Sequence, residues 1–165
     1  MRVTERTKYE PFRSVEKYLT KDATAKLKEA AEGQFGRMQE LTFAQFHACA
    51  NGNFDDVLGD TASPTVLQVY WAKRFADFVE EFTNVLKKMT IQPTPEETRA
   101  SQGLLKVNWD EGLLVFIQSY FGLRSFKDAE QITIGEIIIA KRAQYNQELF
   151  RRRMTAIQTA KLKRK

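Results

Sequence analysis

A row of large apolar side chains that recurs every three or four residues between residues 63 and 89 constrains this fold more than any other feature. An α-helix, with 3.6 residues per turn, returns side chains to one face at this spacing, whereas a strand alternates with a period of two. Ser63 can cap the helix start and Pro64 suits its first turn. We therefore predict a long amphipathic helix over residues 63–89. The row consists of Leu67, Trp71, Phe75, Phe78, Phe82, Val85 and Met89.

A second long helix is predicted at the C-terminal end, over residues 133–160. Thr133 and Glu136 have the spacing of a capping box, in which each side chain accepts a hydrogen bond from the other residue's backbone amide. Apolar residues follow at helical spacing and continue further than the core of a domain of this size needs. They are Ile139, Ala143, Phe150, Met154 and Ile157, with Asn146 in the same line.

Shorter helices account for the rest of the prediction. Thr42, Thr94 and Asn108 begin further capping patterns. The apolar run over residues 113–121 is either a central helix buried on all sides or a buried strand. Residues 1–10 are a flexible lead-in, and Pro11 opens a short helix. We predict an all-α fold, at least about 60% helical: a single-domain helical bundle over residues 11–150 with a basic helix end over residues 151–165.

The aromatic face of the 63–89 helix is predicted to form the core rather than a cofactor site, because large side chains at helical spacing are typical of packing. Its partners are expected on the apolar run over residues 113–121. The predicted contacts join Trp71, Phe75, Phe78 and Phe82 to Leu114, Ile117 and Phe121.

Residue types that carry catalysis or bind metals are sparse in this chain. His47 and Cys49 lie two residues apart on a predicted helix, so they point in different directions and cannot close a tetrahedral metal site by themselves. Neighbouring carboxylates, such as Glu96 and Glu97, suit helix caps and solvated faces better than a metal clamp. A glycine-rich phosphate loop is also missing, since Gly33 and Gly36 lack the lysine and the strand that such a loop requires. We predict a non-enzymatic protein with no catalytic residue, metal, cofactor or small-molecule substrate.

The sequence contains no stretch of about 18 to 20 uncharged apolar residues, which a membrane span needs. The first eight residues contain no apolar core, so no secretory signal is expected there. A single cysteine is compatible with a reducing compartment. We expect the protein in the cytoplasm of the cell that makes it.

Charge is distributed unevenly along the chain. Residues 141–165 contain nine Lys or Arg and one acid, Glu148, for a net charge of +8, whereas residues 1–140 contain 17 basic and 20 acidic residues. This end can be a solvated helix terminus, a phosphate-binding segment, or a surface that docks onto an acidic protein or an anionic lipid. The candidate partner-binding residues are the apolar Phe150, Met154 and Ile157 and the basic Arg151, Arg152, Arg153, Lys161, Lys163, Arg164 and Lys165, a basic set that includes no acid.

The order of elements over residues 109–157 resembles a known family. An apolar helix runs into the segment from Tyr120 to Glu130, and a long polar helix then begins at Thr133. This order is similar to the C-terminal portion of tail assembly chaperones and related small helical proteins of tailed bacteriophages. The resemblance implies a non-enzymatic protein that keeps tape-measure and tail-tube subunits soluble until the tail polymerises. The basic C-terminus and the longer N-terminal half depart from that pattern, which leaves room for a virion connector or a capsid-associated component.

Two classes of function follow. The first is an assembly or structural protein of a phage-type particle, whose partners are other assembly proteins or sister subunits and which is found in the cytoplasm or the virion. The alternative is a nucleic-acid-binding helical module that uses the basic C-terminal segment.

Overall fold

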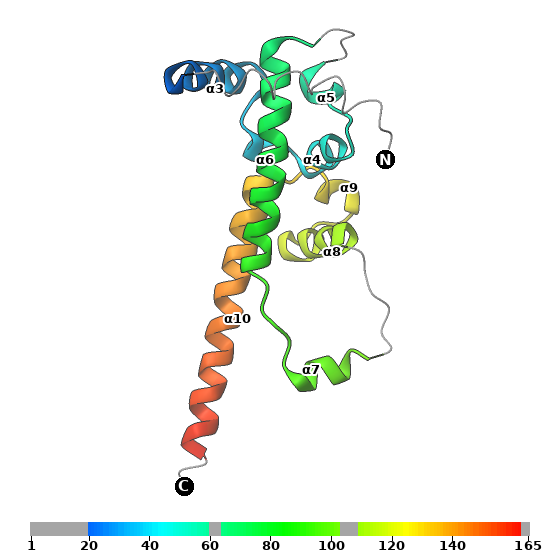
Figure 1. Ribbon diagram of the computed structural model, residues 1–165. Coiled ribbons are helices and arrows are strands. Elements are labelled where there is room, and N and C mark those ends of the chain that lie inside the picture. Colours follow the sequence, from blue (N-terminus) through cyan, green and yellow to red (C-terminus); the bar gives the residue numbers. More distant parts are fainter. Residues whose placement is uncertain (1–19, 60–63, 103–108, 163–165) are drawn as a thin grey trace.

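The computed structural model describes residues 20–59, 64–102 and 109–162 of the chain, and this part is all-α (Figure 1). Helices account for 79% of the described residues, which contain no strand. The predicted fold class is therefore confirmed. Several predictions lie outside the described residues: the lead-in over residues 1–10, the helix at Pro11, and the caps at Ser63 and Asn108.

Two long helices dominate the described chain, as predicted, and the shorter helices except α7 gather around them at one end (Figure 1). In chain order the elements are α3 (Lys21–Phe35), the 3₁₀ helix η2 (Met38–Glu40), α4 (Phe43–Ala50), α5 (Asp55–Leu58), α6 (Val66–Lys88), α7 (Pro95–Ala100), α8 (Trp109–Phe121), α9 (Phe126–Ala129) and α10 (Ile134–Leu162).

Helix α6 begins later than predicted, at Val66 rather than near residue 63. Thr65 is the N-cap: its hydroxyl accepts a hydrogen bond from the Gln68 amide at 3.3 Å, and the Gln68 side chain accepts one from the Thr65 amide at 2.7 Å. The prediction that Pro64 opens the helix is therefore wrong, because it precedes the cap. The buried Gln68 side chain also donates to the Leu58 carbonyl at 2.7 Å, which joins α5 to the start of α6.

Phe46 of α4 lies at the centre of the aromatic core. Its ring centroid is 5.5 Å from that of Phe75, 5.2 Å from that of Phe82 and 6.3 Å from that of Phe78. Trp71 is buried and stacks on Phe75. Three of the four predicted core aromatics of α6 are buried, but Phe78 is only partly so, because it packs at the edge of the cluster. This central position of Phe46 was not predicted from the sequence.

The run over residues 113–121 is a helix, α8, so the strand alternative is wrong. It is not buried on all sides as predicted: Leu113 and Ile117 are buried in the core, whereas Val115 and Tyr120 are 48% and 43% exposed. The helix covers the core with one face and leaves the other in solvent. Gly122 follows its last residue with φ +64°, the left-handed conformation that commonly ends a helix.

Helix α10 begins against the body of the molecule and extends beyond it. The body is the group formed by α3, η2, α4, α5, α6, α8 and α9. Thr133 and Glu136 form the predicted capping box, with the Thr133 amide 2.9 Å from the Glu136 carboxylate and the Glu136 amide 3.3 Å from the Thr133 hydroxyl. Ala140 is the last buried residue. The helix continues for a total of 29 residues, about 43 Å at 1.5 Å per residue.

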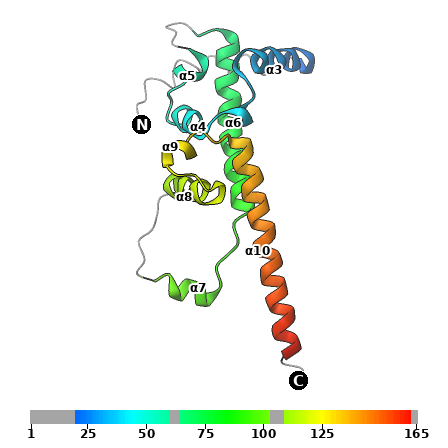
Figure 2. The same cartoon turned by 180° about the vertical axis from the view of Figure 1, so that it is seen from behind.

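The body therefore lies at one end of the molecule. Helix α10 starts beside the middle of α6 and runs past the end of α6 in the same direction, so that its C-terminal part extends away from the body, on the side where α7 also lies (Figures 1 and 2). None of the described helices is long and apolar enough to cross a membrane.

Candidate interaction surface on helix α10

Helix α10 presents two opposite faces. Ile134, Ile137 and Ala140 are buried on the face that packs on the body. On the other face lies a row of residues, here called the α10 stripe. Successive residues of a helix are 100° apart, so the stripe occupies an arc of about 80°, and Ile137 points about 160° away from Ile139. The stripe consists of Ile139, Ala143, Asn146, Phe150, Met154 and Ile157.

The large side chains of the stripe are exposed to solvent. The exposed fractions are 67% for Ile139, 67% for Phe150, 39% for Met154 and 50% for Ile157. Among the described residues nine large apolar side chains are exposed, and five of them belong to α10. Isolated exposed apolar residues are normal on protein surfaces, but several of them along one helix face are typical of a surface that binds another molecule.

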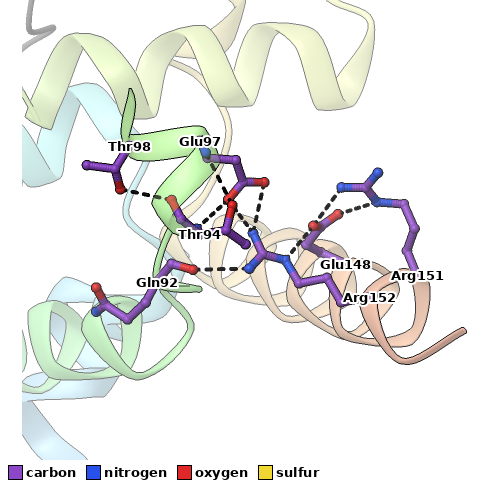
Figure 3. Close-up of polar contacts among 7 residues, drawn as sticks. All are labelled: Gln92, Thr94, Glu97, Thr98, Glu148, Arg151 and Arg152. Carbon is purple, nitrogen blue, oxygen red and sulfur yellow. Dashed lines mark hydrogen bonds and ion pairs between the residues drawn. The ribbon is translucent and has the colours of Figure 1, made fainter. Parts of the chain in front are cut away.

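The three consecutive arginines of α10 have different surroundings, and Figure 3 shows those of Arg151 and Arg152. Arg151 pairs with Glu148, with two nitrogen–oxygen distances of 2.8 Å. Arg152 is only 30% exposed and also bonds to Glu148, at 2.9 Å. Arg153 is exposed. The basic set itself includes no acid, but Glu148, which precedes it, pairs with two of its arginines. The i,i+3 and i,i+4 spacing from Glu148 is the sequence signal that would have indicated both pairs.

Arg152 also joins α10 to a distant part of the chain. Its guanidinium donates to the Gln92 carbonyl at 3.1 Å and to the Glu97 carboxylate at 3.1 Å (Figure 3). Glu97 belongs to α7, whose residues are all exposed, and it completes the capping box of that helix with Thr94. These hydrogen bonds hold the start of α7 against the middle of α10. We refer to this group of Gln92, Glu97, Glu148 and Arg152 as the Arg152 clamp.

The carboxylates of the clamp are stabilised in their charged form. Hydrogen bonds from Arg151 and Arg152 lower the pKa of Glu148 to about 2. The Thr94 amide, and after it Arg152, lowers the pKa of Glu97. A depressed carboxyl pKa means that the ion pairs are complete at neutral pH and are lost as the pH falls through the folded-state pKa. The clamp therefore persists at neutral and mildly acidic pH.

An open groove runs between the end of α6 and α10, on the side of α10 away from the stripe. Met89 and Ile91 line one wall, and Gln144, Tyr145 and Glu148 line the other. Its apolar and amide side chains offer contact surface, and its charged groups are those of the Arg152 clamp and Arg151.

His47 and Cys49 of α4, the residues considered for metal binding or catalysis, differ in their exposure to solvent. Cys49 is buried, and burial, with a smaller contribution from Asp56, raises the pKa of its thiol to about 12, so the reactive thiolate is scarce at neutral pH. His47 is exposed, with its Nδ1 3.2 Å from the side-chain Nδ2 of Asn51. Within residues 20–59, 64–102 and 109–162 no group of three His, Cys, Asp or Glu side chains could hold a metal ion.

The remaining candidate residues are only partly described. Lys161 is exposed near the end of α10, while Lys163, Arg164 and Lys165 lie outside the described residues.

Comparison with protein-family models, with curated proteins and with solved structures found no match to this chain.

The clamp leads to a first prediction. Arg152→Gln should increase the rate of backbone amide exchange in α7 at least about twofold, because exposed ion pairs contribute modestly but α7 has no buried side chain to replace them. Hydrogen–deuterium exchange followed by mass spectrometry measures this rate. Arg153→Gln is the matched control, since it removes the same charge from the next position and should leave the rate unchanged. Equal exchange in both variants would contradict the clamp.

Proposed function

We propose that this chain is a non-enzymatic assembly protein of a phage-type particle, and that it works by docking onto protein along the α10 stripe. The observation that carries the proposal is a row of exposed apolar side chains on a helix that extends beyond its own body (Figure 1). Burying apolar surface is favourable by about 25 cal/mol per Å², so an exposed row of this kind favours association.

The stripe favours a protein partner over nucleic acid. A phosphate backbone attracts cations but offers no apolar surface against which Ile139, Phe150 or Met154 would be buried. Two of the three consecutive arginines also bind carboxylates of the chain itself, which reduces the positive charge that this segment presents to phosphates. Both observations support contacts between proteins.

The phage-type role is supported by the resemblance over residues 109–157. Small helical proteins of that kind act by keeping other assembly subunits soluble or by connecting parts of a particle, and neither task requires a catalytic centre. The partners would then be other assembly proteins or sister subunits, met in the cytoplasm of the producing cell or in the particle.

One observation favours the alternative, a nucleic-acid-binding module: the residues after Glu148 contain no acid and end in a basic cluster. Two variants separate the alternatives. The stripe variant carries Phe150→Ser and Met154→Ser. The charge variant carries Arg153→Gln, Lys161→Gln, Lys163→Gln and Arg164→Gln, and it leaves Arg151 and Arg152 in place because these bind carboxylates.

The tagged full-length chain is used to capture protein from the producing cell. The amount captured by the stripe variant is expected to be at least about tenfold lower than that captured by the wild type, since the exposed apolar contacts dominate docking. The charge variant should retain most of it. Binding to duplex DNA of about 30 base pairs is measured in parallel over a salt series. The proposal is contradicted if only the charge variant loses binding and DNA affinity falls steeply with salt, because that pattern belongs to phosphate contacts.

A further inference from the structure

We infer that the α10 stripe is occupied by the α10 stripe of a second copy of this chain, with the two helices antiparallel. This inference rests on the proposed function, in which the stripe is a docking surface, and it names the partner. Two identical surfaces related by a twofold axis contact each other reciprocally, which is the commonest arrangement in protein oligomers.

The positions of the stripe coincide when one helix is reversed against the other. Ile139 and Ile157 lie nine residues on either side of position 148, and Asn146 and Phe150 lie two residues on either side of it. A twofold axis at this position sets Ile139 against the partner's Ile157 at both ends. It also sets the small Ala143 opposite the long Met154, so that a small side chain faces a large one.

Charged residues extend the same match. Glu136 and Lys161 fall on the stripe face, one turn beyond its two ends, and both are exposed. The two positions lie about twelve residues from the axis, at helical spacing from the stripe. An antiparallel pair therefore brings Glu136 of each copy to Lys161 of the other. A parallel pair in register would set Glu136 against Glu136 and Lys161 against Lys161, and would be opposed by repulsion between like charges.

The charge distribution of the whole chain favours the same orientation. Residues 141–165 have a net charge of +8 and residues 1–140 a net charge of −3. Antiparallel helices place each basic end beside the body of the other copy, at the start of α10. There η2 packs on α10, with the Ile134 amide 2.9 Å from the Leu41 carbonyl, and it carries the exposed Glu40. Parallel helices would bring the two basic ends together.

The spacing of the stripe also suits two straight helices. Its residues follow at intervals of four, three, four, four and three, so that positions repeat after eleven residues. An eleven-residue repeat corresponds to 3.67 residues per turn, close to the 3.6 of an undistorted helix. The row therefore stays on one side of α10 over its whole length, and a second helix can follow it without strong supercoiling.

Cross-linking tests the orientation of the two helices. Ile139→Cys and Ile157→Cys chains are co-expressed with different tags and treated with a short bismaleimide, while the native Cys49 is buried and sheltered from it. We expect a covalent dimer that contains one chain of each kind, and none from either variant alone. Dimers of each variant with itself would show a parallel pair and overturn the inference, as would the absence of any cross-link.

A charge exchange tests the ionic contacts in full-length protein. Sedimentation equilibrium should show that the wild-type chain is a dimer. Glu136→Lys or Lys161→Glu alone should raise its dissociation constant at least about tenfold. The two changes combined should restore near wild-type association, because the ion pairs are then reversed rather than lost. Loss of the Glu136 capping contact alone would not be rescued by Lys161→Glu. Glu96→Lys, an exposed acid away from the stripe, is the control.

The results also separate this inference from the proposed function. Suppose that the wild-type chain stays monomeric at about 100 μM and that the stripe variant still captures less protein than the wild type. This result overturns self-association and leaves docking on another protein in place. A monomeric wild type whose stripe variant captures protein normally overturns both. A double charge variant that associates no better than the single variants overturns the antiparallel arrangement.

Discussion

Replacing Phe46 with alanine is expected to lower the free energy of unfolding by about 3 to 5 kcal/mol. Phe46 is 4% exposed, and its ring contacts the rings of Phe75, Phe78 and Phe82. Its removal therefore creates a cavity between α4 and α6 and also removes buried apolar surface. Domains of this size are stable by only about 5 to 15 kcal/mol, so the variant should lie close to the limit of folding. Urea denaturation followed by circular dichroism measures the change.

Phe150→Ala is the matched control for this experiment, because Phe150 is 67% exposed on α10. Its effect on unfolding should stay within about 0.5 kcal/mol when measured at concentrations too low for association. A loss below about 1 kcal/mol for Phe46→Ala would mean that α4 does not pack on α6 as described.

The second large effect is expected at the start of α10, where two isoleucines two residues apart lie on opposite faces. Ile137 is fully buried and Ile139 is 67% exposed. Ile137→Ala should cost about 2 to 5 kcal/mol, because it creates a cavity where α10 packs on the body. Ile139→Ala should change stability by no more than about 0.5 kcal/mol.

Thermal unfolding of dilute protein measures this difference, with the melting temperature of Ile137→Ala well below that of Ile139→Ala. The same pair separates folding from association, since Ile139→Ala should weaken dimerisation without unfolding the monomer. Equal destabilisation by both substitutions would show that the stripe face is covered by the chain itself, and would leave no free surface for a partner.

Local sequence signals were sufficient for the position and type of most helices. Thr42, Thr94 and Thr133 each precede a glutamine or glutamate by three residues, and each is a cap in the structure. These interactions join residues at most four positions apart, so the sequence alone specifies them. The start of α6 was misplaced because Ser63 with Pro64 and Thr65 with Gln68 are competing local signals, and hydrogen bonds of the Gln68 side chain favour the second.

Which faces of α8 and α4 are buried could not be predicted in the same way. The run over residues 113–121 is apolar on all sides, so its pattern does not indicate that Leu113 and Ile117 face the core while Val115 and Tyr120 face solvent. The part played by Phe46 was missed for a related reason. A short helix such as α4 has few turns from which to recognise a periodic face, and its partner lies on another helix.

The candidate surface was likewise predictable from the sequence only in part. The α10 stripe and the basic end were visible in the sequence, because helical spacing and charge composition are properties of neighbouring residues. Only the tertiary structure decided that the stripe stays exposed and that Arg152 binds Glu97, which is 55 residues away along the chain. Periodicity follows from backbone geometry within a few residues, whereas burial and ion pairing between helices depend on which distant segments the completed fold brings together.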